Sequence, residues 1–164
     1  MKRFICLMLA LLLLLLCGGC ADSLSKDATF YYCTADYQFG KDTPVILGES
    51  RDISGHEGEL SYLVALYLAG PSGKKLVSPF PKNTKLVSVQ TEDDHVTIEL
   101  SYLGRQITDS RFVLACACLT LTTMDVTDAQ SVTILSGERS ITMDAKDLLL
   151  YDSVTSQYAK EETQ

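Results

Sequence analysis

The sequence has no tryptophan and only two histidines, so any histidine-dependent active site would have to use His56 or His95. Short motifs typical of enzymes and ion-binding modules are also missing. There is no Gly-x-Ser-x-Gly nucleophile turn, no glycine-rich phosphate loop, no zinc-ligand spacing and no EF-hand. The sequence therefore predicts neither a cofactor nor a metal site, offers no catalytic residues, and favours a protein that is not an enzyme.

Positive charge is scarce. Lysine and arginine together number 14 against 21 acidic residues, which gives a formal net charge of −7. Loss of residues 1–19, which hold two basic and no acidic residues, would take the charge to about −9. Such a balance argues against a basic face that binds nucleic acid or anionic lipid headgroups, so we expect no nucleic-acid partner.

Cysteines are too few beyond the first twenty residues to form a disulfide framework. Three of the six remain there, Cys33, Cys116 and Cys118, and an odd number leaves at least one unpaired. Cys116 and Cys118 lie two residues apart in a segment predicted to be helical, so they do not share a helix face. We expect all three to behave as small buried hydrophobic residues, and whether any two of them pair stays open.

The amino-terminal residues resemble a secretory signal. Lys2 and Arg3 precede an uncharged apolar run of 13 residues, Phe4–Leu16, which is shorter than the roughly 20 residues a membrane-spanning helix needs. Gly18, Gly19 and Cys20 follow, and the sequence then becomes polar. This organisation predicts export, with residues 1–19 as a signal peptide.

The Gly18-Gly19-Cys20 sequence resembles a bacterial lipobox. That resemblance implies a diacylglyceryl thioether on Cys20, which would become the first residue of an extracytoplasmic protein anchored to the membrane by lipid. The residue three positions before Cys20 is usually leucine and is Cys17 here, with Leu16 one position further back. The alternatives are an unlipidated signal cut near Ala21 and an uncleaved anchor.

Beyond the signal, the sequence predicts a tether over residues 20–27, one domain over 28–145 and a tail over 146–164. An amphipathic helix is expected from a capping box at Ser54–Glu57 to Gly70-Pro71, and a second, more apolar helix from Thr108 or Asp109 to about residue 123. Strands are expected over 28–34, 45–53, 85–91, 95–101, 132–135 and 140–143, with a further short pairing at 148–151. We expect an α+β fold, a small single-layer sheet of about four to five strands with two helices packed on one face.

Three segments of this domain resemble the GerMN domain of sporulation and spore-germination lipoproteins. They are LVALYLAGP (63–71), LVSPFPKNTKLVSV (76–89) and VTIELS (96–101), with Glu99 where the family more often has aspartate. The resemblance covers about residues 28–140. It implies an α/β domain that acts outside the membrane by contact with proteins or the cell envelope, and it brings no catalytic residues. The best-known member carries two copies, whereas this chain has room for one.

Three functional hypotheses follow. The first is a lipid-anchored interaction module that docks an envelope protein through a sheet edge or the Pro79–Thr84 loop. The second is a lipoprotein that captures a small molecule or glycan, which requires a concave apolar pocket that a single layer is not expected to form. The sequence does not identify its ligand-binding residues; Tyr31, Tyr32, Tyr62 and Tyr102 could form a surface that faces a sugar or a partner, but packing within the domain explains these tyrosines better.

The third hypothesis is an envelope hydrolase, which needs His56 or His95 beside a nucleophile and a carboxylate. The acidic residues around the predicted 92–94 turn, including Glu99, could also bind calcium, but turn formation explains them better.

Overall fold

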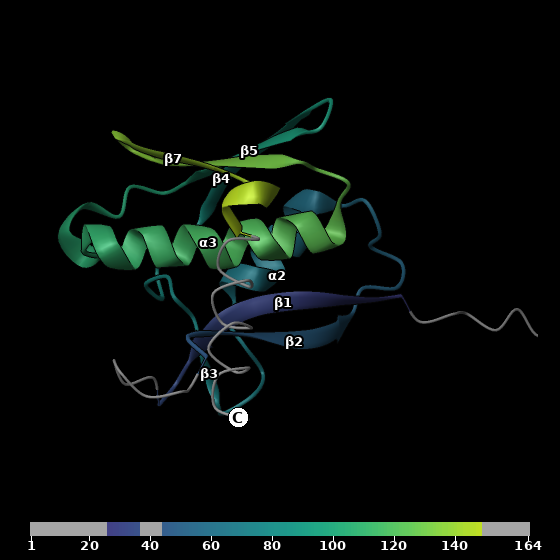
Figure 1. The fold of residues 1–164 in the computed structure, drawn as a ribbon, viewed down its shortest axis with the longest axis horizontal. Helices are drawn as coiled ribbons and strands as arrows, with labels where there is room; N and C mark the ends of the chain where they lie inside the picture. Colours follow the sequence, from purple (N-terminus) through teal and green to yellow (C-terminus); the bar gives the residue numbers. More distant parts are fainter. Residues whose placement is uncertain (1–25, 37–43, 149–164) are drawn as a thin grey trace, which may run out of the picture.

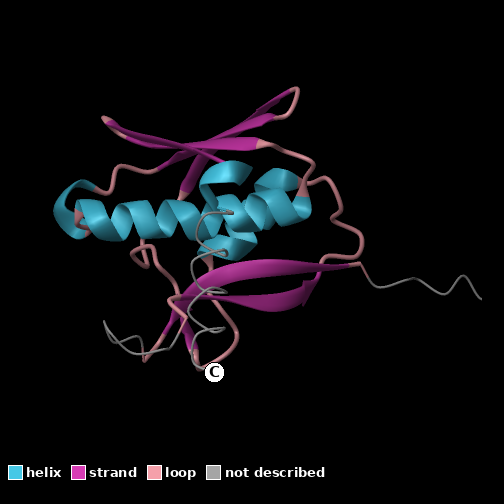
Figure 2. Ribbon diagram, in the orientation of Figure 1, coloured by secondary structure: helices cyan, strands magenta, loops and turns pink. Residues whose placement is uncertain are grey.

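The computed structural model describes residues 26–36 and 44–148, so the predicted signal peptide, Cys20 and most of the tail lie outside it. The described residues form three layers, with two helices between a three-stranded and a four-stranded sheet (Figures 1 and 2). The α+β class is confirmed, whereas the prediction of one sheet with helices on a single face is wrong.

The first sheet has the order β2-β1-β3 and is antiparallel throughout. The second has the order β4-β5-β6-β7, with β5 and β6 parallel and the other pairs antiparallel. The strands are β1 (Asp27–Thr34), β2 (Ile46–Asp52), β3 (Leu76–Val77), β4 (Leu86–Glu92), β5 (His95–Leu100), β6 (Ser131–Ser136) and β7 (Arg139–Asp144). The helices are α2 (Leu60–Leu68), the 3-10 helix η1 (Gly104–Gln106) and α3 (Asp109–Val126).

Helix α3 has apolar residues on two faces, and this explains why the domain has two sheets instead of one. One of its faces is fully buried, with Phe112, Cys116 and Leu119 in the core. A second apolar stripe, at the helical spacing of Leu114, Leu121 and neighbouring residues, faces another direction. A single sheet covers only one face of a helix, so the chain places β1 on one side of α3 and β6 and β7 on another.

Helix α2 begins later than the capping box predicted. Its N-cap is Glu59, which makes no side-chain capping hydrogen bond. Ser54 Oγ instead accepts a hydrogen bond from the Lys26 amide, and the Glu57 carboxylate accepts one from the Gly55 amide. Gly58, at φ 82°, is in the left-handed region and interrupts any helix before Leu60.

The end of α2 and the β4–β5 hairpin agree with the sequence prediction. Gly70, with φ 96°, ends the helical path directly before Pro71. Asp93 and Asp94 form a two-residue turn between Glu92 and His95, which pair across the hairpin. Asp93 has φ 52°, a conformation that aspartate tolerates better than most residues.

Two further elements differ from expectation. The stretch between the first predicted helix and the strand predicted from residue 85, for which no strand was expected, contains strand β3, whose Val77 and Leu76 pair with Cys33 and Thr34. At the other end of the domain, residues 145–148 form a helical turn, so Leu148 does not begin the short strand predicted over 148–151; residues 149–151 lie outside the described chain.

Side chains of α3 cover one edge of β1. The amide of Thr29 donates to the Asp125 carboxylate at 2.7 Å, and the amide of Tyr31 donates to the Thr122 hydroxyl at 2.9 Å. β1 pairs with β2 along its other edge, so these donors would otherwise lack partners. The helix therefore takes the place of a neighbouring strand along this part of β1.

Arg51 attaches the first sheet to the end of α2. Its Nη2 donates to the Gly70 carbonyl at 2.7 Å, and its Nε lies 2.8 Å from the carboxylate of Glu49. The guanidinium also lies over the rings of Phe30 and Tyr32. Both ion-pair side chains are largely buried, with 12% and 15% of their surface exposed.

Arg139 makes a similar attachment in the second sheet. Its two terminal nitrogens donate to the carbonyls of Ile107 and Gly104, each at 3.1 Å, and it lies over the ring of Phe112. Its ion pair with Asp109 is longer, at 3.4 Å, and the Asp109 side chain is 92% exposed. Arg139 thus holds the segment that leads into α3.

Candidate functional site

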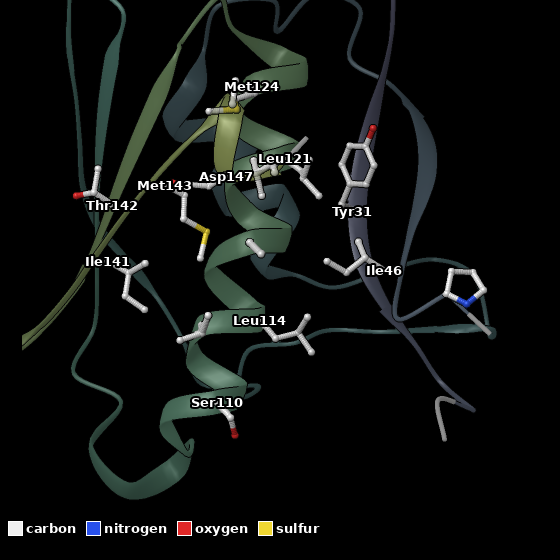
Figure 3. A pocket seen from close by; sticks show the side chains of 15 residues that line it. Tyr31, Ile46, Ser110, Leu114, Leu121, Met124, Ile141, Thr142, Met143 and Asp147 are labelled. Carbon is white, nitrogen blue, oxygen red and sulfur yellow. The ribbon is translucent and has the colours of Figure 1, made fainter. Parts of the chain in front are cut away.

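An apolar groove of about 950 Å³ runs beside α3 (Figure 3). Its floor is the second apolar stripe of the helix, in which Val113 is 46% exposed. The stripe consists of Val113, Leu114, Ala117, Leu121 and Met124, and Ser110 of the same helix also lines the groove. The sequence predicted a buried helix here because its middle is apolar almost all round, and it did not distinguish this open face from the buried one.

The two walls of the groove come from different sheets. Tyr31 on β1 and Ile46 on β2 form one side, and Ile141 and Met143 on β7 form the other (Figure 3). The helical turn 145–148 closes part of the rim through residues that include Asp147 and Leu148. These residues lie far apart in the sequence, so no local motif signals the groove.

The groove offers little polar chemistry. Asp147 is the single charged residue among those that line it, and Ser110, Thr142 and the Tyr31 phenol add hydroxyls. Burial, together with the nearby Asp125 carboxylate, raises the pKa of Tyr31, so this phenol is neutral at physiological pH. The groove suits an apolar occupant better than a polar substrate.

The expectation that no pocket would form is therefore wrong, but the tyrosine surface does not form either. Tyr31 alone of the four considered tyrosines lines the groove. Tyr32 is fully buried against Tyr67, with ring centroids 4.8 Å apart. Tyr62 stacks on His56, and Tyr102 covers Gly104 and Gly137, so the four tyrosines do not share one face.

Neither histidine completes a catalytic constellation within the described residues. His56 Nδ1 lies 3.2 Å from the Glu59 carboxylate, but no nucleophile accompanies the pair. His95 Nδ1 lies 2.6 Å from the Ser131 hydroxyl, and no carboxylate contacts that histidine. Three serines that could be examined as nucleophiles have structural partners instead: Ser54 accepts from the Lys26 amide, Ser78 donates to the Phe80 carbonyl, and Ser101 accepts from the Lys85 amide.

The three cysteines of the described chain are free and buried, as expected. Burial raises the pKa of Cys116 to about 12, which keeps it a protonated, poorly nucleophilic thiol. A hydrogen bond with Cys33, followed by burial, raises the pKa of Cys118 as well. The same contact with Cys118 lowers the pKa of Cys33, so only Cys116 and Cys118 are assigned to packing rather than reactivity.

The acidic residues of the β4–β5 turn are exposed turn residues. In the part of the chain that the structure describes, no group of three or more histidine, cysteine or acidic side chains is arranged to hold a metal ion. Over the same residues, no helix combines the length and apolar character needed to cross a membrane.

The two docking surfaces considered from the sequence differ in accessibility. In the Pro79–Thr84 loop, Phe80 packs edge-on against Tyr67 in the core, and only Lys82 and Asn83 are exposed. The outer edge of β4, by contrast, has no pairing strand among the described residues.

The β4 edge, defined as the outer side of Ser88–Glu92, presents backbone groups to solvent. In a two-residue hairpin the residues that flank the turn exchange hydrogen bonds, and pairs alternate from there. Glu92 pairs with His95, so Thr91 and Val89 direct their amides and carbonyls outward. A register shift between Leu86 and Ser88 limits this regular edge, and it leaves Val87 59% exposed.

Comparison with known proteins identifies the fold family. The family model described as "Germane: Sporulation and spore germination" matches residues 29–142. Among curated proteins, none matches the chain.

Two solved structures are similar to this chain, each at 21% sequence identity. The tandem GerMN domains of the sporulation protein GerM from Bacillus subtilis align with a TM-score of 0.52 over 74% of this chain and 43% of that one. A provisionally assigned lipoprotein from Clostridium perfringens aligns with a TM-score of 0.46 over 74% of this chain and 89% of that one. With the family model matching most of its length, this chain belongs to the GerMN domain family, which is linked to sporulation and spore germination and is not known as a family of enzymes.

Proposed function

We propose that the protein is a non-enzymatic interaction module, held outside the cytoplasmic membrane by a lipid on Cys20, that docks an envelope protein through the β4 edge. Its setting would be sporulation or spore germination, as for its family. The docking proposal rests on the contrast between the edge of β1 and the β4 edge. The edge of β1 is covered by Asp125 and Thr122 of α3, whereas the β4 edge is open.

Other edges are less suited to pairing with a partner strand. β2 carries Glu49, Arg51 and Asp52, and β3 has only two residues. β7 continues directly into the helical turn 145–148. The β4 edge is uncharged from Ser88 to Thr91, and added strands gain main-chain hydrogen bonds at such edges.

The lipid anchor is supported by the Gly-Gly-Cys sequence and by the short apolar run before it. Two or three acyl chains on one residue would hold the domain at the membrane and concentrate it near partners in the same layer. A Cys20→Ala protein should therefore carry no lipid, as measured by its intact mass. It should also leave the membrane fraction when cells are fractionated. Retention of a Cys20→Ala protein on the membrane with full function would contradict the anchor.

The docking step can be tested by removing one outward-facing amide hydrogen from the β4 edge. Thr91→Pro removes an outward amide but leaves the β4–β5 hydrogen-bonded pairs intact, because Thr91 lies in a non-hydrogen-bonded pair. Thr91→Ala is the matched control, since it keeps the amide. With a photo-crosslinker at Gln90 in the native envelope, partner crosslinks should be lost in Thr91→Pro and kept in Thr91→Ala. Equal crosslinking in both variants would exclude pairing through this edge.

A second candidate function, capture of an apolar small molecule, is favoured by the groove beside α3. Its volume lies within the roughly 300–1,000 Å³ typical of ligand sites. However, those sites also hold a few converging polar groups that orient the ligand, and here the charged lining is limited to Asp147. Native mass spectrometry of protein taken from its envelope should reveal a co-purifying small molecule if this function operates.

A further inference from the structure

The contact between strand β1 and helix α3 follows a register. The amide of Thr29 donates to the Asp125 carboxylate, and two residues further along the strand the amide of Tyr31 donates to the Thr122 hydroxyl. A step of two residues along the strand is thus matched by a step of three residues back along the helix. Two strand residues span about 7 Å. Three or four helix residues rise about 5–6 Å, so the two elements stay nearly in step.

Continuing this register brings two cysteines together. The next step leads from Tyr31 to Cys33 on β1 and from Thr122 to Cys118 on α3. Cys118, Thr122 and Asp125 are four and three residues apart, which places them on one face of the helix. In the structure, the thiols of Cys33 and Cys118 share a hydrogen bond. The register and the thiol contact therefore identify the same pair.

Cys116 lies on the same helix but on another face. It precedes Cys118 by two residues, which turns its side chain by roughly 200° about the helix axis. Cys116 and Cys118 are both fully buried, whereas Cys33 is 9% exposed. The three thiols thus divide into a contacting pair and a buried neighbour that serves as a matched control.

We propose that Cys33 and Cys118 form a disulfide that joins β1 to α3, and that a disulfide oxidant of the cell envelope makes the bond. The envelope location rests on the proposed function, and disulfides persist in oxidising compartments outside the cytoplasm. Two thiols that already share a hydrogen bond need a small shift to reach the S–S bond length of about 2.05 Å. The bond secures the edge of β1 at which Thr29 and Tyr31 already donate to α3.

The reaction is thiol–disulfide exchange in two steps. The Cys33 thiolate attacks one sulfur of the oxidant, forms a mixed disulfide and releases one oxidant thiolate. The Cys118 sulfur then attacks the Cys33 sulfur, and the second oxidant thiolate leaves. The two protons lost by the cysteines go to these two thiolates. Two protein thiols and one oxidant disulfide therefore become one protein disulfide and two oxidant thiols.

The surroundings of the two sulfurs assign the first attack to Cys33. The hydrogen bond with Cys118 lowers the pKa of Cys33 against the effect of burial, and the charge of Arg111 lowers it further. Cys33 is also the more exposed of the two. In the reduced protein Cys118 is a buried, protonated thiol that packs in the core. It is closed to outside reagents and reacts only across its contact with Cys33.

The first measurement uses the full-length protein isolated from its native envelope. Its thiols are trapped by alkylation in denaturant at the moment of lysis, and each cysteine is then located by peptide mass spectrometry. The inference expects one linked peptide pair that contains Cys33 and Cys118 and separates on reduction. Cys116 should carry the alkylating group in every molecule.

The second measurement starts from the purified, reduced protein and adds oxidised glutathione. The unaltered protein and the Cys116→Ser control should both form the bridge between Cys33 and Cys118. Cys118→Ser should stop at the mixed disulfide of Cys33 with glutathione, because the second attacking sulfur is missing. Cys33→Ser should leave Cys116 and Cys118 free. The result for the unaltered protein stands without any variant, so a variant that folds poorly does not decide the test.

Free Cys33 and Cys118 after treatment with oxidised glutathione would overturn the pair, and so would a bridge from Cys33 to Cys116. Free thiols only in the protein from the envelope would overturn the envelope as the source of the oxidant. Exchange in the purified protein requires neither the lipid anchor nor the β4 edge. Failure of this inference is thereby distinguished from failure of the proposed function.

Discussion

The two sheets are attached to the helices between them by the same kind of contact, but not to the same degree. In each, an arginine donates to carbonyls next to a helix and lies over a phenylalanine ring. Arg51 and its partner Glu49 are largely withdrawn from water, whereas the partner of Arg139 is exposed. The difference predicts that similar geometry gives unequal stabilisation, because the cost of leaving a group unpaired depends on its burial.

The largest effect is expected for Arg51→Ala. The change leaves the Gly70 carbonyl and the Glu49 carboxylate without this partner, and it removes the cation from above Phe30. Breaking a largely buried ion pair costs about 3 kcal/mol of unfolding free energy. Chemical denaturation of the domain measures this loss, and a loss smaller than that of Arg139→Ala would reverse the comparison.

Arg139→Ala should cost less, about 1–2 kcal/mol. Two hydrogen bonds to the carbonyls of Gly104 and Ile107 are lost, but the arginine is partly solvated and water replaces some of them. Asp109→Ala is the control for the ion pair. Because that carboxylate is almost fully exposed, its removal should change the free energy of unfolding by less than about 0.5 kcal/mol.

A third effect on the Arg51 side of the comparison depends on pH and concerns Glu49. Burial pushes its pKa upward, but hydrogen bonds from the Gly73 and Ser72 amides and from Arg51 outweigh that and lower the pKa below the ordinary 4.5. A lowered folded-state pKa means that the stabilisation is present above 4.5 and is lost as the pH falls through the lowered value.

Glu49→Gln should therefore reduce the free energy of unfolding by about 1 kcal/mol at neutral pH, with the difference from the unaltered protein shrinking in acid. Denaturation curves at several pH values test this. The exposed Glu138→Gln serves as the matched control and should show no such pH-dependent difference.

Local signals in the sequence predicted much of the fold. Alternation from Val96 to Leu100 and the acidic turn before it defined the β4–β5 hairpin, since strand pairing and turn formation are short-range. The apolar content of α3 likewise predicted a buried helix. The apolar content of α3 did not reveal that strands cover the helix from two directions. The positions of those strands depend on which strands pair with each other, and strand pairing is not a local property of the α3 sequence.

The same limit applies to the contacts that hold the layers together. Arg51 lies on a strand, and its carbonyl partner at Gly70 is 19 residues away, so no local pattern pairs them. The groove combines Tyr31, the α3 stripe and β7, three regions that only the tertiary fold brings together. The capping box at Ser54–Glu57 failed for a local reason, since Gly55 and Gly58 both adopt left-handed conformations there.

The position of β1 has a mechanical consequence. It is the first strand after the predicted tether, and it is held by seven residue pairs with β2 and by two side chains of α3. A force that acts on the amino-terminal end of β1 along the strand axis would load these bonds together, so they would have to rupture at once. A domain attached to a surface through such a central strand resists tension better than one attached through a peripheral strand, whose bonds open one at a time.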